Sequence, residues 1–239
     1  MAWNLFTNTG SQKTTTSSVS SVSTIASAST IAVTPGSTIL LTGTTTVSTI
    51  TGGVVGSYIT LFASGQATNV CVLLNNGTTS NALSLRDNAN FGIYAGESVT
   101  CMYDGTKWLE TARNIKTELA YAQTVTDTTV TTTTANGNEV ATTSAVTMDG
   151  STVIIAELFC NALDNGSSWI EPLFAVDGVA VYIVGYQTAT NTGPATSLVR
   201  YTPTAGSHTF GFRAKVDSGT GLVAATSFAP AFIRISRAR

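Results

Sequence analysis

The sequence predicts an all-β protein with two modules, and three observations lead to this prediction. Thr, Ser, Val and Ile dominate the composition together with 21 Gly, a mixture typical of strands separated by turns. Short runs with a two-residue period recur at intervals of roughly 8–12 residues. A heptad or a long 3.6-residue period is missing from the sequence. We expect one β-rich module over about 14–113 and an antiparallel β-sandwich over about 125–239.

The first module is expected to be a series of short strands that ends in a hairpin. The hairpin lies in "SVTCMYDGTKWLETAR" (Ser98–Arg113), where Asp104 and Gly105 supply the turn. Tyr103 and Trp108 are expected to face each other across that turn as packing partners. The preceding strands are predicted at Ser29–Val33, Ser37–Gly43, Thr44–Gly52, Gly56–Ala63 and Asn69–Gly77.

A linker is expected between the modules, at 114–124. Asn114–Gln123 has a short helical pattern, with Ile115, Leu119 and Ala122 on one side. We therefore predict a short helix here.

The second module is expected to be an antiparallel sandwich. Ser151–Leu163 is a strongly apolar strand, and Glu171–Gln187 holds an Asp-Gly pair (Asp177 and Gly178) between two β-rich runs. This pair is a strong local signal for a hairpin. Ser197–Gly219 predicts two strands about a Pro-Thr-Ala-Gly turn, and the last residues predict one more strand.

Charge is scarce and unevenly placed. Asp, Glu, Lys and Arg make up 10% of the chain, against about 25% in typical domains. The net charge of −2 gives no electrostatic reason to expect nucleic acid as a partner. No charged residue stands between Lys13 and Arg86, which predicts that much of this segment contacts other copies of itself in an intertwined oligomer. Amyloid-like self-association is the alternative interpretation.

The sequence holds no recognisable catalytic or metal-binding set. The acids are scattered, and Asp104, Asp149, Asp164 and Asp177 stand in turn contexts. His208 is the single histidine, and neither a G-x-S-x-G elbow nor a phosphate-binding loop occurs. Three cysteines without C-x-x-C spacing predict buried thiols rather than a disulfide framework. We expect no enzyme, no cofactor and no metal.

Large apolar residues at the N-terminus and isolated aromatic residues are the candidates for binding. Trp3, Leu5 and Phe6 lie on an arm, 1–13, which is too short to form a core of its own. The arm either packs back on its own oligomer or docks on a partner protein. Trp169 and Tyr186 are the candidates for ligand contacts at the surface of the second module.

One part of the chain carries a recognisable pattern. The run from about Ser29 to Arg113 combines a "G(T)xxIxxI" strand, a "GxxVTL" strand, an "LxLxxxxN" segment and an "aGxSVTLxYDGTxWxE" hairpin with a closing Arg, and Cys101 replaces the usual aliphatic residue of the hairpin. This run, about a third of the chain, resembles a β-module of tailed-bacteriophage virion proteins. The matching positions are Gly43, Ile50, Gly56, Leu61, Leu83, Leu85, Gly96, Val99, Tyr103, Asp104, Gly105, Trp108, Glu110 and Arg113.

The resemblance implies a plan for the whole molecule. Proteins of this kind are trimeric fibres, spikes and head-decoration proteins with an N-terminal virion anchor, an interlocked β stalk and a C-terminal β-sandwich head. For this chain it implies an intertwined trimeric module, a short β-solenoid or barrel-like stalk, at 14–113. The last hundred or so residues resemble jelly-roll or tumour-necrosis-factor-like heads.

The leading hypothesis is a non-enzymatic homotrimer that decorates a phage capsid and binds the major capsid protein or another virion protein through its arm. Such a protein is made in the host cytoplasm and located in the virion. The sequence shows neither a signal peptide nor a transmembrane segment, so no membrane partner is expected. The alternative is a tail-fibre or baseplate protein that recognises a host surface glycan. A depolymerising enzyme is a second alternative, and it would need clustered acids in a groove.

Overall fold

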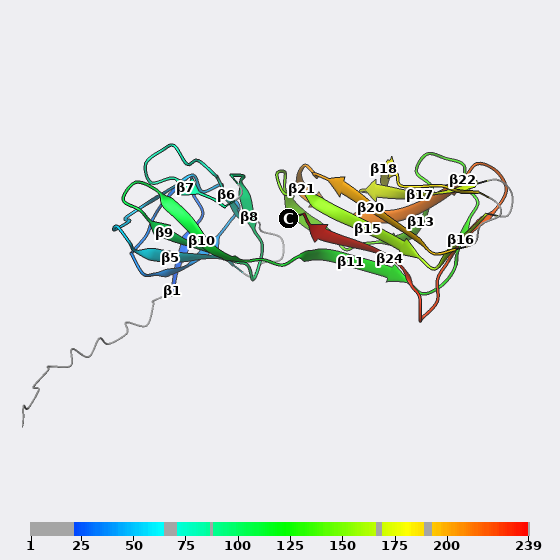
Figure 1. The fold of residues 1–239 in the computed structure, drawn as a ribbon, viewed down its shortest axis with the longest axis horizontal. Helices are drawn as coiled ribbons and strands as arrows, with labels where there is room; N and C mark the ends of the chain where they lie inside the picture. The colour runs from blue at the N-terminus through cyan, green and yellow to red at the C-terminus, as the bar shows by residue number, and fades with distance from the viewer. Residues whose placement is uncertain (1–21, 65–70, 87, 166–168, 189–192, 239) are drawn as a thin grey trace, which may run out of the picture.

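The computed structural model describes residues 22–64, 71–86, 88–165, 169–188 and 193–238, and it shows two β-rich lobes (Figure 1). Strands are the regular elements throughout these residues, as the alternating sequence predicts. Each lobe has its own buried apolar cluster. No helix in the described part of the chain has the length and apolar character needed to cross a bilayer.

The N-terminal lobe is built around a six-stranded sheet in the order β1-β3-β5-β9-β10-β7. The pairs β1–β3 and β3–β5 are parallel, and the chain returns between them through the parallel pair β2–β4 of a second sheet. Parallel neighbours need such crossovers, and here short strands supply them instead of helices. The result is a short solenoid-like coil, which the antiparallel pair β5–β9 then extends.

The strands of this lobe have the following bounds: β1 (Val22–Ala26), β2 (Thr30–Ala32), β3 (Thr38–Thr42), β4 (Thr49–Thr51), β5 (Tyr58–Ala63), β6 (Cys71–Leu73), β7 (Leu83–Ser84), β8 (Phe91–Ile93), β9 (Ser98–Tyr103) and β10 (Trp108–Asn114). β6 and β8 form a further small antiparallel sheet.

The core of the N-terminal lobe is made by the chain itself. Ile39 and Leu41 on β3, and Ile59 and Leu61 on β5, are buried because alternate residues of a strand point to the same face. Most aliphatic residues of the charge-free segment are therefore buried within their own lobe, whereas Val22, Val54 and Val55 are exposed.

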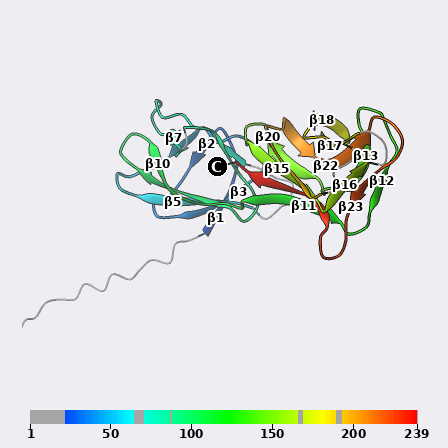
Figure 2. The same ribbon diagram turned by 45° about the vertical axis from the view of Figure 1, so that its right-hand side comes forward.

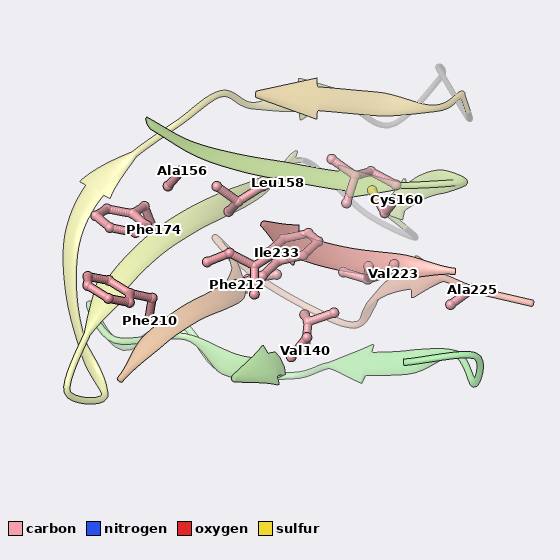
Figure 3. Packing of buried hydrophobic residues seen from close by; sticks show 14 of the residues in the cluster. Val140, Ala156, Leu158, Cys160, Phe174, Phe210, Phe212, Val223, Ala225 and Ile233 are labelled. Carbon is pink, nitrogen blue, oxygen red and sulfur yellow. The ribbon is translucent and has the colours of Figure 1, made fainter. Parts of the chain in front are cut away.

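The C-terminal lobe is an antiparallel β-sandwich. One sheet has the order β11-β24-β15-β20, and the facing sheet has the order β13-β22-β17-β18, with β19 also paired to β17. Figure 3 shows that side chains of both sheets, among them Leu158, Phe174, Phe212 and Ile233, meet in the space between them. The smaller sheets β12-β23-β16 and β14-β21 complete the lobe.

The strands of this lobe have the following bounds: β11 (Glu118–Thr124), β12 (Thr128–Val130), β13 (Asn138–Thr142), β14 (Val146–Asp149), β15 (Ile154–Cys160), β16 (Ala162–Asn165), β17 (Trp169–Val176), β18 (Val179–Ile183), β19 (Gln187–Thr188), β20 (Ala195–Tyr201), β21 (Ala205–His208), β22 (Phe210–Val216), β23 (Gly221–Ala224) and β24 (Ala231–Arg237).

The predicted helix over Asn114–Gln123 is wrong. Most of this segment is β11, which pairs with β24 from Glu118↔Ser236 to Thr124↔Ala231. Leu119, Ala120 and Ala122 pack against the sandwich core. The helical spacing extends over only ten residues and is a weak signal. Strand pairing wins because the backbone groups along the edge of β24 need hydrogen-bond partners, and β11 supplies them. β11 thus belongs to a sheet of the C-terminal lobe.

A buried ion pair joins the two lobes. Glu97, in the turn before β9, accepts hydrogen bonds from the backbone amides of Tyr94 at 2.9 Å and Lys116 at 2.8 Å. Its Oε2 atom also lies 3.2 Å from Nη2 of Arg237, at the end of β24. Tyr94 reaches across the same junction, and its hydroxyl lies 3.7 Å from Sδ of Met148. The lobes are therefore held by buried polar contacts as well as by the connecting chain.

Candidate interaction surface

The hairpin of the N-terminal lobe is a packed element. Tyr103 and Trp108 are opposite each other in the β9–β10 register, with their ring centroids 5.1 Å apart. The Trp108 side chain is fully buried, and its Nε1 donates to the Ile50 carbonyl at 2.7 Å. A ring in this position stabilises the lobe and is closed to external ligands.

The turn of this hairpin is stabilised by its aspartate. The Asp104 carboxylate accepts hydrogen bonds from the amides of Lys107 and Thr106, both at 2.8 Å, and these bonds lower its pKa. Gly105 follows with φ of 105°, a backbone conformation that side chains disfavour. The turn chemistry accounts for both residues.

The predicted surface aromatic residues differ in exposure. Trp169, at the start of β17, is half-buried, and the Lys215 ammonium lies 5.7 Å from its ring centroid. Tyr186 is 73% exposed. The arm residues Trp3, Leu5 and Phe6 lie outside the described residues.

The single histidine forms a chain of hydrogen bonds with Asp177. Nδ1 of His208 lies 2.7 Å from Oδ2 of Asp177, and Nε2 lies 3.2 Å from the Thr204 hydroxyl and 3.0 Å from the Thr204 carbonyl oxygen. Asp177 also accepts a hydrogen bond from the Thr209 amide at 2.8 Å, which is the main reason that its pKa is lowered. The carbonyl contact at Nε2 marks this set as a brace between the β17–β18 turn and the end of β21 rather than a nucleophile with its base.

The described residues contain no group of three or more His, Cys, Asp or Glu side chains able to hold a metal ion. The thiols of Cys71, Cys101 and Cys160 are all buried and free, as the sequence predicts.

An apolar patch covers one open edge of the sandwich, where β18 and β20 lie side by side. Tyr182 and Tyr201 make an edge-on ring contact at 6.1 Å, and the Ser197 hydroxyl donates to the Val184 carbonyl at 3.0 Å. We call this surface the edge patch. Its large apolar members are Val179, Val181, Tyr182, Ile183, Tyr186 and Leu198.

The edge patch lacks charge along β18, whereas Arg200 stands on β20 and lines the same groove. Residues 179–187 carry no charge, and within the described residues β18 and β20 are the outer strands of their sheets. Proteins normally guard such edges with charged side chains, prolines or bulges, because open backbone groups invite pairing with another chain. A shallow groove runs along the patch between Tyr182–Val184 and Leu198–Arg200.

A protruding phenylalanine lies on the other side of the same sandwich. Phe228 is 99% exposed at the tip of the loop that joins β23 to β24, where Thr226 and Ala229 close a tight turn with reciprocal backbone hydrogen bonds. In Figures 1 and 2 this loop extends from one side of the sandwich, and β18 lies on the opposite side. Phe228 was not predicted from the sequence, although it is an isolated aromatic residue between "ATS" and "APA".

No family model matches the sequence, and no curated protein matches it. Among solved structures, the chain is similar to the CBM36-1 domain of a multidomain xylanase from the hindgut metagenome of Trinervitermes trinervoides, at 12% identity over 50% of this chain and 97% of that one, with a TM-score of 0.31.

Two further solved structures are similar in part. BuGH86 in complex with neoagarooctaose shares 16% identity over 74% of this chain and 30% of its own, with a TM-score of 0.31. An exo-beta-1,3-galactanase from Phanerochaete chrysosporium with beta-1,3-galactotriose shares 10% identity over 53% and 30%, with a TM-score of 0.24. The chain therefore spans less than a third of either of these two proteins, and likenesses this low carry no functional conclusion.

Proposed function

We propose that this chain is a non-enzymatic structural protein of a tailed-bacteriophage particle, which forms a homotrimer and decorates the capsid surface. The observation that carries the proposal is the edge patch together with Phe228 on the opposite side of the sandwich. The phage assignment itself rests on the "YDGTKW" hairpin and its preceding strands.

A protruding side chain on one edge and an apolar groove on the other suit a head-to-tail contact between copies. Such contacts are heterologous, and they close into a ring when the rotation between copies allows it. Phe228 of one copy would enter the groove beside Ile183 and Leu198 of the next. This arrangement buries an aromatic anchor in an apolar pocket, which is how a few residues come to dominate an interface.

The test is the mass of the protein in solution, measured by light scattering for the wild type, Phe228→Ser and Leu198→Lys. We expect a trimer for the wild type and monomers for the two variants. Val55→Ser is the matched control, because Val55 is an exposed valine at the far lobe, and it should remain a trimer. A monomeric wild type at micromolar concentration, or a trimeric Phe228→Ser variant, would refute the proposal.

Mixing the two variants tests the head-to-tail geometry. Phe228→Ser keeps an intact groove and Leu198→Lys keeps an intact Phe228, so the mixture can form a single good contact and should yield a 1:1 dimer. An interface in which the same patch meets itself predicts no recovery on mixing.

Attachment to the particle is proposed to run through the N-terminal arm. Deleting residues 1–13 should leave a trimer that no longer binds phage particles. If the truncated protein binds particles as well as the full chain, another surface is the anchor.

The second candidate function is a tail protein that binds a host glycan, and the exposed ring of Tyr186 favours it. Imaging of labelled protein on particles separates the two functions. Label over the capsid surface supports decoration, and label confined to the tail tip supports receptor binding.

A further inference from the structure

A cleft of about 550 Å³ lies between the two lobes. Its walls carry Arg86 and Arg113 from the N-terminal lobe and Arg200 and Arg237 from the C-terminal lobe. These four arginines are a large share of the 11 basic residues in the chain, and none of the described residues that line the cleft is acidic. A protein with a net charge of −2 therefore concentrates positive charge at one concave site.

Arg237 forms part of the floor of this cleft, and its side chain is 7% exposed. Nη2 donates to the Gly92 carbonyl at 3.2 Å and to Glu97. Nε and Nη1 are buried, and neither has a hydrogen-bond partner in the described part of the chain. Buried donors of a charged group are costly to leave unpaired. A ligand that offers hydrogen-bond acceptors to these two nitrogens would therefore stabilise the site.

Aromatic contacts hold two of the guanidinium groups in place. The Arg237 guanidinium carbon lies 4.8 Å from the ring centroids of Phe91 and Tyr94, and that of Arg113 lies 4.4 Å from the Phe91 centroid. Arg113 is also paired with Glu110, whose side chain is fully buried. Such groups are already ordered before a ligand arrives, which reduces the entropy lost on binding.

The other two arginines remain available. The Arg86 side chain is 55% exposed and lies 3.9 Å from Glu110, a carboxylate that Arg113 already engages. Arg200 is exposed on β20 and forms no ion pair with any described residue. Glu97 and Glu110 face the guanidinium groups of Arg237 and Arg113. The Asp149 carboxylate, which accepts hydrogen bonds from Ser151 and Thr152 of the cleft wall, is a third acidic group close to the site.

We propose that the cleft between the lobes binds a small-molecule oxyanion, with an acidic or phosphorylated sugar as the ligand class. The planar guanidinium fork matches both carboxylate and phosphate oxygens. The volume is within the range of small-molecule sites, and Ile115 and Val153 add apolar contact for a ring. Residues of both lobes line the site, so the ligand would also hold the lobes together. This proposal is independent of the trimer.

The experiment is isothermal titration of the full chain with glucuronic acid, glucose 6-phosphate, inorganic phosphate and neutral glucose. At least one sugar oxyanion should bind with affinity that falls as salt rises, and glucose should not bind. Binding of glucuronic acid identifies a carboxylate site, and binding of glucose 6-phosphate alone identifies a phosphate site. Either result supports the proposal.

Variants locate the site. Arg86→Ala and Arg200→Ala should each weaken binding by about tenfold, the loss of one charge-assisted contact. Arg237→Lys keeps the positive charge without the two unpartnered donors, and it should weaken binding while the far-UV spectrum stays native. Arg234→Ala is the matched control, since Arg234 lies on the same strand and pairs with Glu157 outside the cleft.

Two results would overturn the proposal. The first is absence of binding by both sugar oxyanions at concentrations up to about 10 mM, a range that covers weak sites, whether or not inorganic phosphate binds. The second is binding that Arg86→Ala and Arg200→Ala leave unchanged. Arg200 also lines the groove of the edge patch, so the mass of the Arg200→Ala variant is measured by light scattering. If that mass differs from the wild type, the Arg86→Ala variant alone decides whether the cleft is the binding site.

Discussion

Replacing Trp108 with phenylalanine tests whether the "YDGTKW" hairpin anchors the N-terminal lobe. The indole Nε1 donates a buried hydrogen bond of 2.7 Å to the Ile50 carbonyl, which joins β10 to the second sheet of the lobe. Phenylalanine removes this donor and leaves the buried carbonyl without it, at a cost of about 1–3 kcal/mol. The smaller ring also leaves a void, which costs about 1–2 kcal/mol more. We therefore expect the free energy of unfolding to fall by about 2–5 kcal/mol.

Urea denaturation followed by far-UV circular dichroism measures this change. With a slope of about 2 kcal/mol per molar urea, the midpoint for the N-terminal lobe should move down by about 1–2.5 M. Trp169→Phe is the matched control, because the same chemical change falls on a half-buried ring, and its cost should stay below about 1 kcal/mol. A Trp108→Phe variant as stable as the wild type, or a larger loss for Trp169→Phe, would show that the hairpin does not anchor the core.

Three further predictions concern packing, acid stability and thiol reactivity. Gly53→Ala places a Cβ 2.6 Å from the Tyr103 ring, so thermal unfolding should show a loss of about 1–3 kcal/mol, whereas Gly77→Ala, with 3.7 Å of clearance, should be nearly neutral. The lowered pKa of Asp177 stabilises the fold above pH of about 4, and this contribution disappears as pH falls through the folded-state pKa. Asp177→Asn should therefore lose up to about 1 kcal/mol at neutral pH and converge with the wild type in acid. Burial raises the pKa of all three thiols, so a thiol reagent near pH of about 8 should label the unfolded but not the folded protein. These pKa values are about 11 for Cys71, about 12 for Cys101 and about 11 for Cys160.

Local turn chemistry made several elements predictable from the sequence. Asp177 and Gly178 have φ of 51° and 78°, and they link β17 to β18 through the pair Val176↔Val179, as an Asp-Gly pair predicts. The alternation of apolar residues also placed the short strands of the N-terminal lobe. Turn residues and strand alternation both depend on contacts within a few residues of the chain, so a short stretch of sequence is enough to predict them.

Pairings between distant segments could not be predicted in this way. Two strands were expected about the Pro-Thr-Ala-Gly turn, with no partners assigned. The structure has β20, β21 and β22 here, and β20 pairs with β15, β21 with β14, and β22 with β17 and β13. The pairing of β11 with β24 and the contact of Glu97 with Arg237 also join segments that are far apart in sequence. No local pattern records such partners, so the cleft and the edge patch became visible in the structure alone.

The structure changes where the contact between copies is expected. The absence of charge between Lys13 and Arg86 predicted that this segment packs against other copies. Most of its aliphatic residues fill the core of their own lobe, while Val22, Val54 and Val55 are exposed. Hydroxyl groups on the strands pair with each other, with Thr60 and Thr100 oxygens 3.1 Å apart and Thr30 and Thr49 oxygens 2.7 Å apart. Such pairs satisfy a surface without charge, so the missing charge has an explanation within one copy, and the intertwined first module stays a prediction. The C-terminal lobe, by contrast, exposes apolar side chains on two opposite sides, so we expect it to carry the principal contact between copies.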